Sequence, residues 1–128
     1  MGEIKTFEDL EVWKKGCQLA VEVIVDFHKF SIFSLKDQVQ RCALSIPSNI
    51  AEGSERDSTA DYIRFLRYSK GSCGELRTQL YITQRINNQL NLNTELNLNH
   101  KIEESRSISK MLQALINSLQ KKSRSAKP

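Results

Sequence analysis

The sequence has few of the residues that build catalytic and metal centres. It contains two histidines, His28 and His100, and neither has a partner at metal-ligand spacing. Its three cysteines, Cys17, Cys42 and Cys73, form no Cys-x-x-Cys pair. No Gly-rich loop follows a strand-like segment, so a phosphate-binding fingerprint is absent. We therefore predict a protein that is not an enzyme and has no catalytic residue, metal or cofactor.

Long apolar runs are also absent. No stretch approaches the roughly 20 uncharged apolar residues that cross a bilayer, so we expect no membrane partner. The first residues lack the basic and apolar regions of a secretory signal. An odd number of scattered cysteines suits a reducing compartment, which predicts a cytoplasmic location.

What the sequence does contain is helical periodicity. Apolar residues recur at spacings of three and four in four segments, which predicts helices at roughly 7–30, 34–52, 58–87 and 94–122. Short connections between such helices favour antiparallel neighbours. The prediction is an all-α, up-down-up-down antiparallel four-helix bundle over residues 1–122, followed by a basic, frayed tail at 123–128.

The apolar stripes predict which side chains form the core. In the first helix the main stripe is Leu10, Trp13, Cys17, Ala20, Ile24 and Phe27, with Val12, Leu19 and Val23 as a partial second edge. In the third helix it is Tyr62, Leu66, Ser69, Cys73, Leu76, Leu80 and Thr83. In the fourth helix it is Leu98, Ile102, Ser105, Ser109, Leu112, Ile116 and Leu119.

Turn and capping residues predict where the helices begin and end. Ser34 and Ser58 each precede an aspartate by three residues, the pattern of a capping box at a helix start. Gly53 is expected to end the second helix in a left-handed conformation. The Asn-rich segment 87–93 predicts the third connection, after which Asn93 or Thr94 caps the last helix.

Charge divides the sequence into two unequal halves. Residues 1–60 carry seven Lys/Arg and ten Asp/Glu, whereas residues 61–128 carry twelve and five. The second half therefore has a net charge of +7, which favours a polyanionic partner. The alternative is that these cations only solvate helix surfaces.

The basic residues of the third helix form a stripe that Tyr81 shares. Such a stripe can follow a phosphate backbone, and an aromatic ring within it can stack on an unpaired base. We predict RNA or DNA binding by Arg64, Arg67, Lys70, Arg77 and Arg85, with Arg106, Lys110, Lys121 and Lys122 from the last helix. The competing hypothesis is an oligomeric protein-interaction scaffold that does not bind nucleic acid.

Two glycines inside the third helix, Gly71 and Gly74, lie away from its apolar stripe. An interior glycine costs about 1 kcal/mol relative to alanine, so a close approach of another subunit or of a nucleic-acid backbone is the favoured explanation. In the second helix Asn49 and Glu52 form a polar flank that we interpret as structural bracing. The residues expected to serve assembly or structure are Asn49, Glu52, Gly53, Gly71, Ser72, Gly74 and Glu75.

Four segments resemble a known family. Residues 7–14 (FEDLEVWK), 40–53 (QRCALSIPSNIAEG), 64–76 (RFLRYSKGSCGEL) and 111–119 (MLQALINSL) are similar to the four-helix-bundle proteins encoded by intervening sequences in bacterial large-subunit ribosomal RNA genes. The resemblance implies a homopentameric ring. It also implies a relation to the accessory variability protein of diversity-generating retroelements, which binds nucleic acid and a reverse transcriptase.

Overall fold

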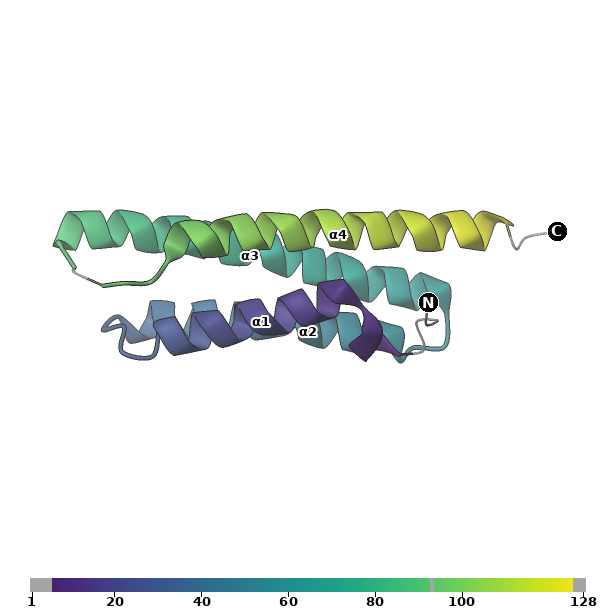
Figure 1. Ribbon diagram of the computed structural model, residues 1–128, viewed down its shortest axis with the longest axis horizontal. Coiled ribbons are helices and arrows are strands. Elements are labelled where there is room, and N and C mark those ends of the chain that lie inside the picture. Colours follow the sequence, from purple (N-terminus) through teal and green to yellow (C-terminus); the bar gives the residue numbers. More distant parts are fainter. Residues whose placement is uncertain (1–5, 93, 126–128) are drawn as a thin grey trace.

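In a computed structural model, which describes residues 6–92 and 94–125, the chain forms one short 3-10 helix and four α-helices and no strand. The 3-10 helix η1 spans Phe7–Asp9, and the α-helices are α1 (Glu11–Asp26), α2 (Phe33–Ser54), α3 (Thr59–Leu90) and α4 (Leu98–Ser125). Consecutive α-helices run in opposite directions and pack side by side (Figure 1). The predicted all-α four-helix architecture is confirmed.

The core runs between the four helices, and α3 contributes to it as predicted. Leu66, Ser69, Cys73, Leu76, Leu80 and Thr83 are all buried. The buried hydroxyl of Ser69 donates to the carbonyl oxygen of Ile46 in α2 at 2.8 Å. A buried hydroxyl costs free energy unless it is hydrogen-bonded, so this bond lets a small polar residue occupy a core position.

The predicted core stripe of α1 was right for half of its residues: Leu10, Ala20 and Phe27 are buried. Val12, Leu19 and Val23 are buried, whereas Trp13, Cys17 and Ile24 of the predicted stripe are half-buried. Apolar residues occur nearly all round this helix, so their spacing alone leaves the buried side undecided. The helix is also shorter than predicted and ends at Asp26.

The predicted bounds of α2 lie within two residues of the observed ones, but the capping roles predicted for Ser34 and Gly53 were wrong. The helix begins at Phe33 after an Ile32 cap that makes no side-chain hydrogen bond, so Ser34 lies inside it and is no cap. Gly53 lies within the helix, with no left-handed backbone conformation. A Cβ atom at Gly53 would lie 2.8 Å from Cβ of Phe65 in α3. The glycine is therefore required for close helix packing.

The connection between α3 and α4 lies later in the sequence than predicted. Helix α3 continues through Leu90, and left-handed Asn91 (φ 50°) ends it. Helix α4 begins at Leu98, so Thr94 does not cap it, and Asn93 lies outside the described residues. The side chain of Leu96 is buried in the core and anchors this connection.

Helix α4 differs from the prediction in its core and in its end. Ile108 and Lys101 are buried, whereas Ser109 is only half-buried. The helix continues through Ser125, so the predicted tail from 123 onward is helical as far as it is described, and 126–128 lie outside the described residues. At 28 and 32 residues, α4 and α3 are the longest helices. The C-terminal end of α3 extends past α1 and α2 (Figure 1).

Candidate nucleic-acid interface

Two side-chain contacts join α3 to α4 along one side of the helix pair. Lys70 Nζ donates to Gln113 Oε1 at 2.6 Å. Two to three turns further along α3, Arg106 Nη2 donates to the hydroxyl oxygen of Tyr81 at 2.5 Å. These contacts fix which faces of the two long helices lie beside each other at the surface.

Basic side chains gather around these contacts. At 100° per residue, four cations of α3, which are Arg67, Lys70, Arg77 and Arg85, lie within an arc of about 80° around that helix. On α4, Arg106 and Lys110 lie within about 60° of Gln113. We call this surface the basic face. It consists of Arg67, Lys70, Arg77, Arg85, Arg106 and Lys110.

The cations of the basic face differ in their exposure. Arg67, Arg85 and Lys110 are exposed, whereas Lys70 and Arg77 are half-buried beside α4. Arg106 also pairs with Glu103 on its own helix. Long cationic side chains can lay their stems on a helix surface while their charged ends stay in water. The face therefore presents positive charge along both helices.

Three of the nine predicted nucleic-acid contacts lie elsewhere. Arg64 is at the start of α3, where its guanidinium pairs with Asp61 at 3.2 Å. Lys121 and Lys122 are exposed on the last turns of α4. Lys121 lies on nearly the same side of α4 as Lys110 but about three turns further along the helix. The helical rotation puts Lys122 on the side of α4 that faces α1, away from the basic face. The structure thus brings six of the nine together.

Gly71 and Gly74 lie in the outward part of α3 beside the basic face. Gly71 is exposed and Gly74 is half-buried. A Cβ atom at either position would meet no other atom within 4 Å. Packing within this chain therefore does not require either glycine, in contrast to Gly53.

The other residues assigned to assembly or structure lie mostly along the contact between α2 and α3. Ser72 accepts a hydrogen bond from Ser45 Oγ at 2.7 Å, which links the two helices. Asn49 donates to the carbonyl oxygen of Ser45 at 2.8 Å, so this bond braces its own helix. Glu52 pairs with Arg56 one turn along the chain.

Glu75 is exposed on α3. Helical rotation places it about 80° to 160° from the four cations of α3 in the basic face. The negative charge of Glu75 therefore lies to one side of that face.

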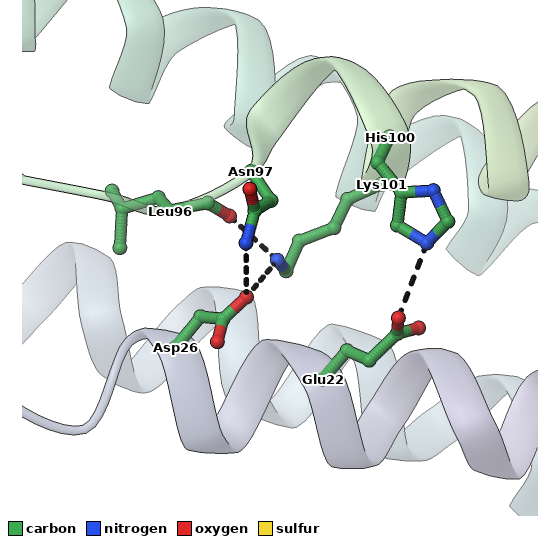
Figure 2. Close-up of polar contacts among 6 residues, drawn as sticks. All are labelled: Glu22, Asp26, Leu96, Asn97, His100 and Lys101. Atoms are coloured by element: carbon green, nitrogen blue, oxygen red, sulfur yellow. Dashed lines mark hydrogen bonds and ion pairs between the residues drawn. The ribbon is translucent and has the colours of Figure 1, made fainter.

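A buried cation was missed by the sequence analysis. Lys101 is fully buried, and its ammonium group donates to Asp26 of α1 and to the carbonyl oxygen of Leu96 at 2.5 Å (Figure 2). Asn97 Nδ2 also donates to Asp26, at 3.4 Å. The signal was present, because Lys101 lies on the same helix face as Ser105, Ile108 and Leu112.

The same network changes the ionisation of Asp26. The hydrogen bond from Lys101 stabilises the carboxylate and holds the pKa of Asp26 below its usual range, against a smaller opposing effect of burial. One turn earlier, Glu22 Oε1 lies 3.1 Å from His100 Nε2 (Figure 2). Together these contacts tie the start of α4 and its preceding connection to the end of α1.

The three cysteines are free thiols. Cys73 is buried, as predicted, and Cys42 is buried as well; burial raises the pKa of each to about 12. Cys17 is half-buried, and burial raises its pKa as well. The thiolate is the reactive form, so these thiols remain protonated and unreactive at neutral pH.

Across residues 6–92 and 94–125, no group of three or more His, Cys, Asp or Glu side chains is arranged to hold a metal ion. Over the same ranges, none of the helices combines the length and the apolar character needed to span a membrane.

The fold and the surface charge define an antiparallel four-helix protein with a basic face on its two longest helices. The family model of the 23S rRNA-intervening sequence protein matches residues 8–114, and the chain belongs to that family. The match extends from η1 to well inside α4, so it includes all six residues of the basic face. No curated protein matches the chain significantly.

Proposed function

We propose that this protein is a non-enzymatic, oligomeric four-helix module that binds RNA or DNA mainly through phosphate contacts from the basic face. The observation that supports this function most is the placement of six cations on one side of the α3–α4 pair. Phosphate contacts carry no sequence information themselves, so this mode of binding is largely independent of sequence.

The exposed amide backbone between these cations supports the same proposal. Gly71 and Gly74 leave open space beside α3, so a phosphate backbone can approach the helix more closely there than at a residue with a side chain. Lys70 and Arg77 flank this segment and supply charge on either side.

Salt dependence tests this mechanism directly. Each phosphate that a cation neutralises releases a counterion, so the logarithm of affinity falls with the logarithm of salt by about 0.7 per contact for a single strand. Six contacts predict a slope of roughly −4, which corresponds to a loss of about two orders of magnitude between 50 and 200 mM salt. Binding that does not change with salt, or no binding at low salt, contradicts the proposal.

The alternative function is a homo-oligomeric scaffold that does not bind nucleic acid. Outward Gly71 also gives another subunit's helix room to approach, and Ile82 and Leu90 are exposed apolar side chains on the same helix. The family resemblance favours a pentamer. Light scattering measures the assembly directly, and a Gly71→Leu change fills the open space with a side chain.

The two functions make different predictions for this variant. If Gly71 lies in a subunit contact, Gly71→Leu lowers the oligomer size while the isolated subunit keeps its helical circular dichroism. If the oligomer stays intact, the glycine is not part of the contact. Titration of the same samples with nucleic acid then shows whether assembly is the whole function.

A further inference from the structure

Tyr81 lies on the basic face with its hydroxyl group bonded to the neighbouring helix. The residue is 40% exposed, and its hydroxyl oxygen accepts a hydrogen bond from Arg106 Nη2 at 2.5 Å. The bond comes from α4, so it engages the ring at one end and leaves part of the ring open to solvent. An exposed aromatic side chain of this kind is suited to stacking.

Arginines precede and follow Tyr81 by one helical turn. Arg77 and Arg85 are four residues away on either side, so they lie on nearly the same side of α3 at a rise of roughly 6 Å from Tyr81. Arg106 approaches the same ring from α4. Three arginines are therefore placed within about one helical turn of Tyr81 or in contact with its hydroxyl group.

An apolar hollow adjoins the basic face, around α3 from Tyr81. Its lining residues lie about 40° to 180° around the helix from Tyr81, and Arg85 is the nearest of them. An open hollow of about 400 Å³ lies along the last turns of α3 and is lined by Ile82, Arg85, Ile86, Gln89 and Leu90. Ile82 and Leu90 are 46% and 59% exposed. This end of α3 extends past the shorter helices α1 and α2 (Figure 1).

We infer that this end of the basic face binds unpaired nucleotides, with one base stacked on Tyr81 and a second base, further along the strand, in the hollow beyond Arg85. Arg77 and Arg85 neutralise the phosphates on either side. In a duplex, the faces of the bases are hidden in the stack, so a duplex offers this surface its phosphates alone. A single strand offers both its phosphates and the faces of its bases. The inference rests on the proposed function and adds a preference for single strands.

The experiment compares matched ligands on one set of variants. Fluorescence anisotropy at 100 mM salt measures the affinity for single-stranded RNA, single-stranded DNA, a duplex of the same sequence and an abasic single strand. The variants are Tyr81→Ala, Tyr81→Phe and, as a control, Tyr68→Ala. Tyr68 is also exposed on α3 but lies about 140° away from Tyr81 around the helix.

The inference predicts a specific pattern. Tyr81→Ala weakens binding to both single strands by roughly 5- to 150-fold, the loss typical of one base–aromatic stack. It leaves the duplex and the abasic strand within about twofold of the unaltered protein. Tyr81→Phe keeps the ring and retains most of the affinity, although it loses the hydrogen bond to Arg106. Tyr68→Ala changes nothing.

Other results show whether the single-strand preference, the proposed function or both are wrong. If Tyr81→Ala and Tyr81→Phe lose affinity equally, or if the duplex loses as much as the single strands, Tyr81 only braces α3 against α4 and the inference is overturned. If the unaltered protein binds all four ligands equally and depends on salt, the proposed function stands without the single-strand preference. If it binds none of them, both fail.

The hollow has its own test. Ile82→Ser with Leu90→Ser is expected to weaken binding to single strands and to leave the oligomer size unchanged in light scattering. A smaller oligomer with unchanged affinity means that a second copy of this chain covers the hollow. That result overturns the part of the inference that concerns the second base.

Discussion

The ammonium group of Lys101 is fully buried and forms an ion pair with Asp26 on another helix. The same group donates to the carbonyl oxygen of Leu96, in the connection that precedes α4. One cation therefore joins α1, α4 and the longest described connection between helices. Removing a single partner from such a pair leaves a buried charge or polar group without compensation.

We predict that Lys101→Met lowers the free energy of unfolding by roughly 2–3 kcal/mol. This is less than the 3–5 kcal/mol typical of a fully buried pair, because a quarter of the Asp26 side chain is exposed. Urea denaturation followed by circular dichroism measures the change. The matched control is Lys110→Met on the exposed side of α4, which is expected to change stability by less than 0.5 kcal/mol.

The double variant Asp26→Leu with Lys101→Met distinguishes ion pairing from packing. Replacing both partners with apolar residues removes the uncompensated carboxylate, so the double variant is expected to be more stable than Lys101→Met alone. If the double variant is less stable than the single one, the cost comes from lost packing instead.

The ion pair also predicts how stability depends on pH. The pKa of Asp26 is lower in the folded protein than its ordinary value near 4 in an unfolded chain. The folded state therefore binds this proton less readily than the unfolded state. The stabilisation is complete above the unfolded pKa and is lost as the pH falls through the folded pKa.

Asp26→Asn removes this titration and leaves a similar shape. The difference in unfolding free energy between the unaltered protein and Asp26→Asn is expected to be constant between pH 5 and 7 and to shrink below about pH 4. Urea denaturation across this pH range measures it. A difference that stays constant down to pH 2 shows that Asp26 contributes nothing to the acid sensitivity.

Substitution by alanine is expected to change stability in opposite directions at Gly53 and at Gly71. A Cβ atom at Gly53 would lie 2.8 Å from Cβ of Phe65, so Gly53→Ala forces α2 and α3 apart and is expected to cost about 1–3 kcal/mol. Gly71 is exposed with no atom near its missing Cβ, so Gly71→Ala is expected to stabilise the subunit by up to about 1 kcal/mol. Thermal unfolding of both variants measures the contrast. Equal effects contradict the packing explanation of Gly53.

The sequence predicted α3 well because its apolar and charged residues occupy separate sides. Leu66, Cys73 and Leu80 lie on one stripe, and all three are fully buried. The buried side of α1 was predicted only in part, because apolar residues of the main stripe and of the partial second edge occupy much of its circumference. Packing of α1 buries half of the main stripe together with the edge that contains Leu19.

The positions of the helix ends depend on contacts between residues that are far apart in the sequence. Gly53 suggested a left-handed stop from its residue type alone, whereas its role is set by Phe65 on the next helix. The burial of Leu96 and the ion pair of Lys101 likewise fix the start of α4 from outside the Asn-rich segment. Local capping patterns contain no information about such partners.

The basic face was predictable in part. The spacing of Arg67, Lys70 and Arg77 already indicated one side of a helix. The contact between Arg106 and Tyr81 depends on how α4 packs on α3, so it required the structure. Lys122 lies outside the basic face because it is on the side of α4 that faces α1, and this side was also known only from the structure.

The most direct test of the central claim is the nucleic-acid affinity of a charge-reversed basic face. Arg67→Glu with Arg85→Glu is compared with Lys14→Glu and Arg41→Glu, which changes the net charge equally at exposed positions on α1 and α2. Both pairs are titrated with the same RNA at 50 mM salt after circular dichroism has shown that they fold. The account predicts that the first pair loses at least tenfold more affinity than the second. Equal losses contradict it, because binding then follows net charge and has no defined face.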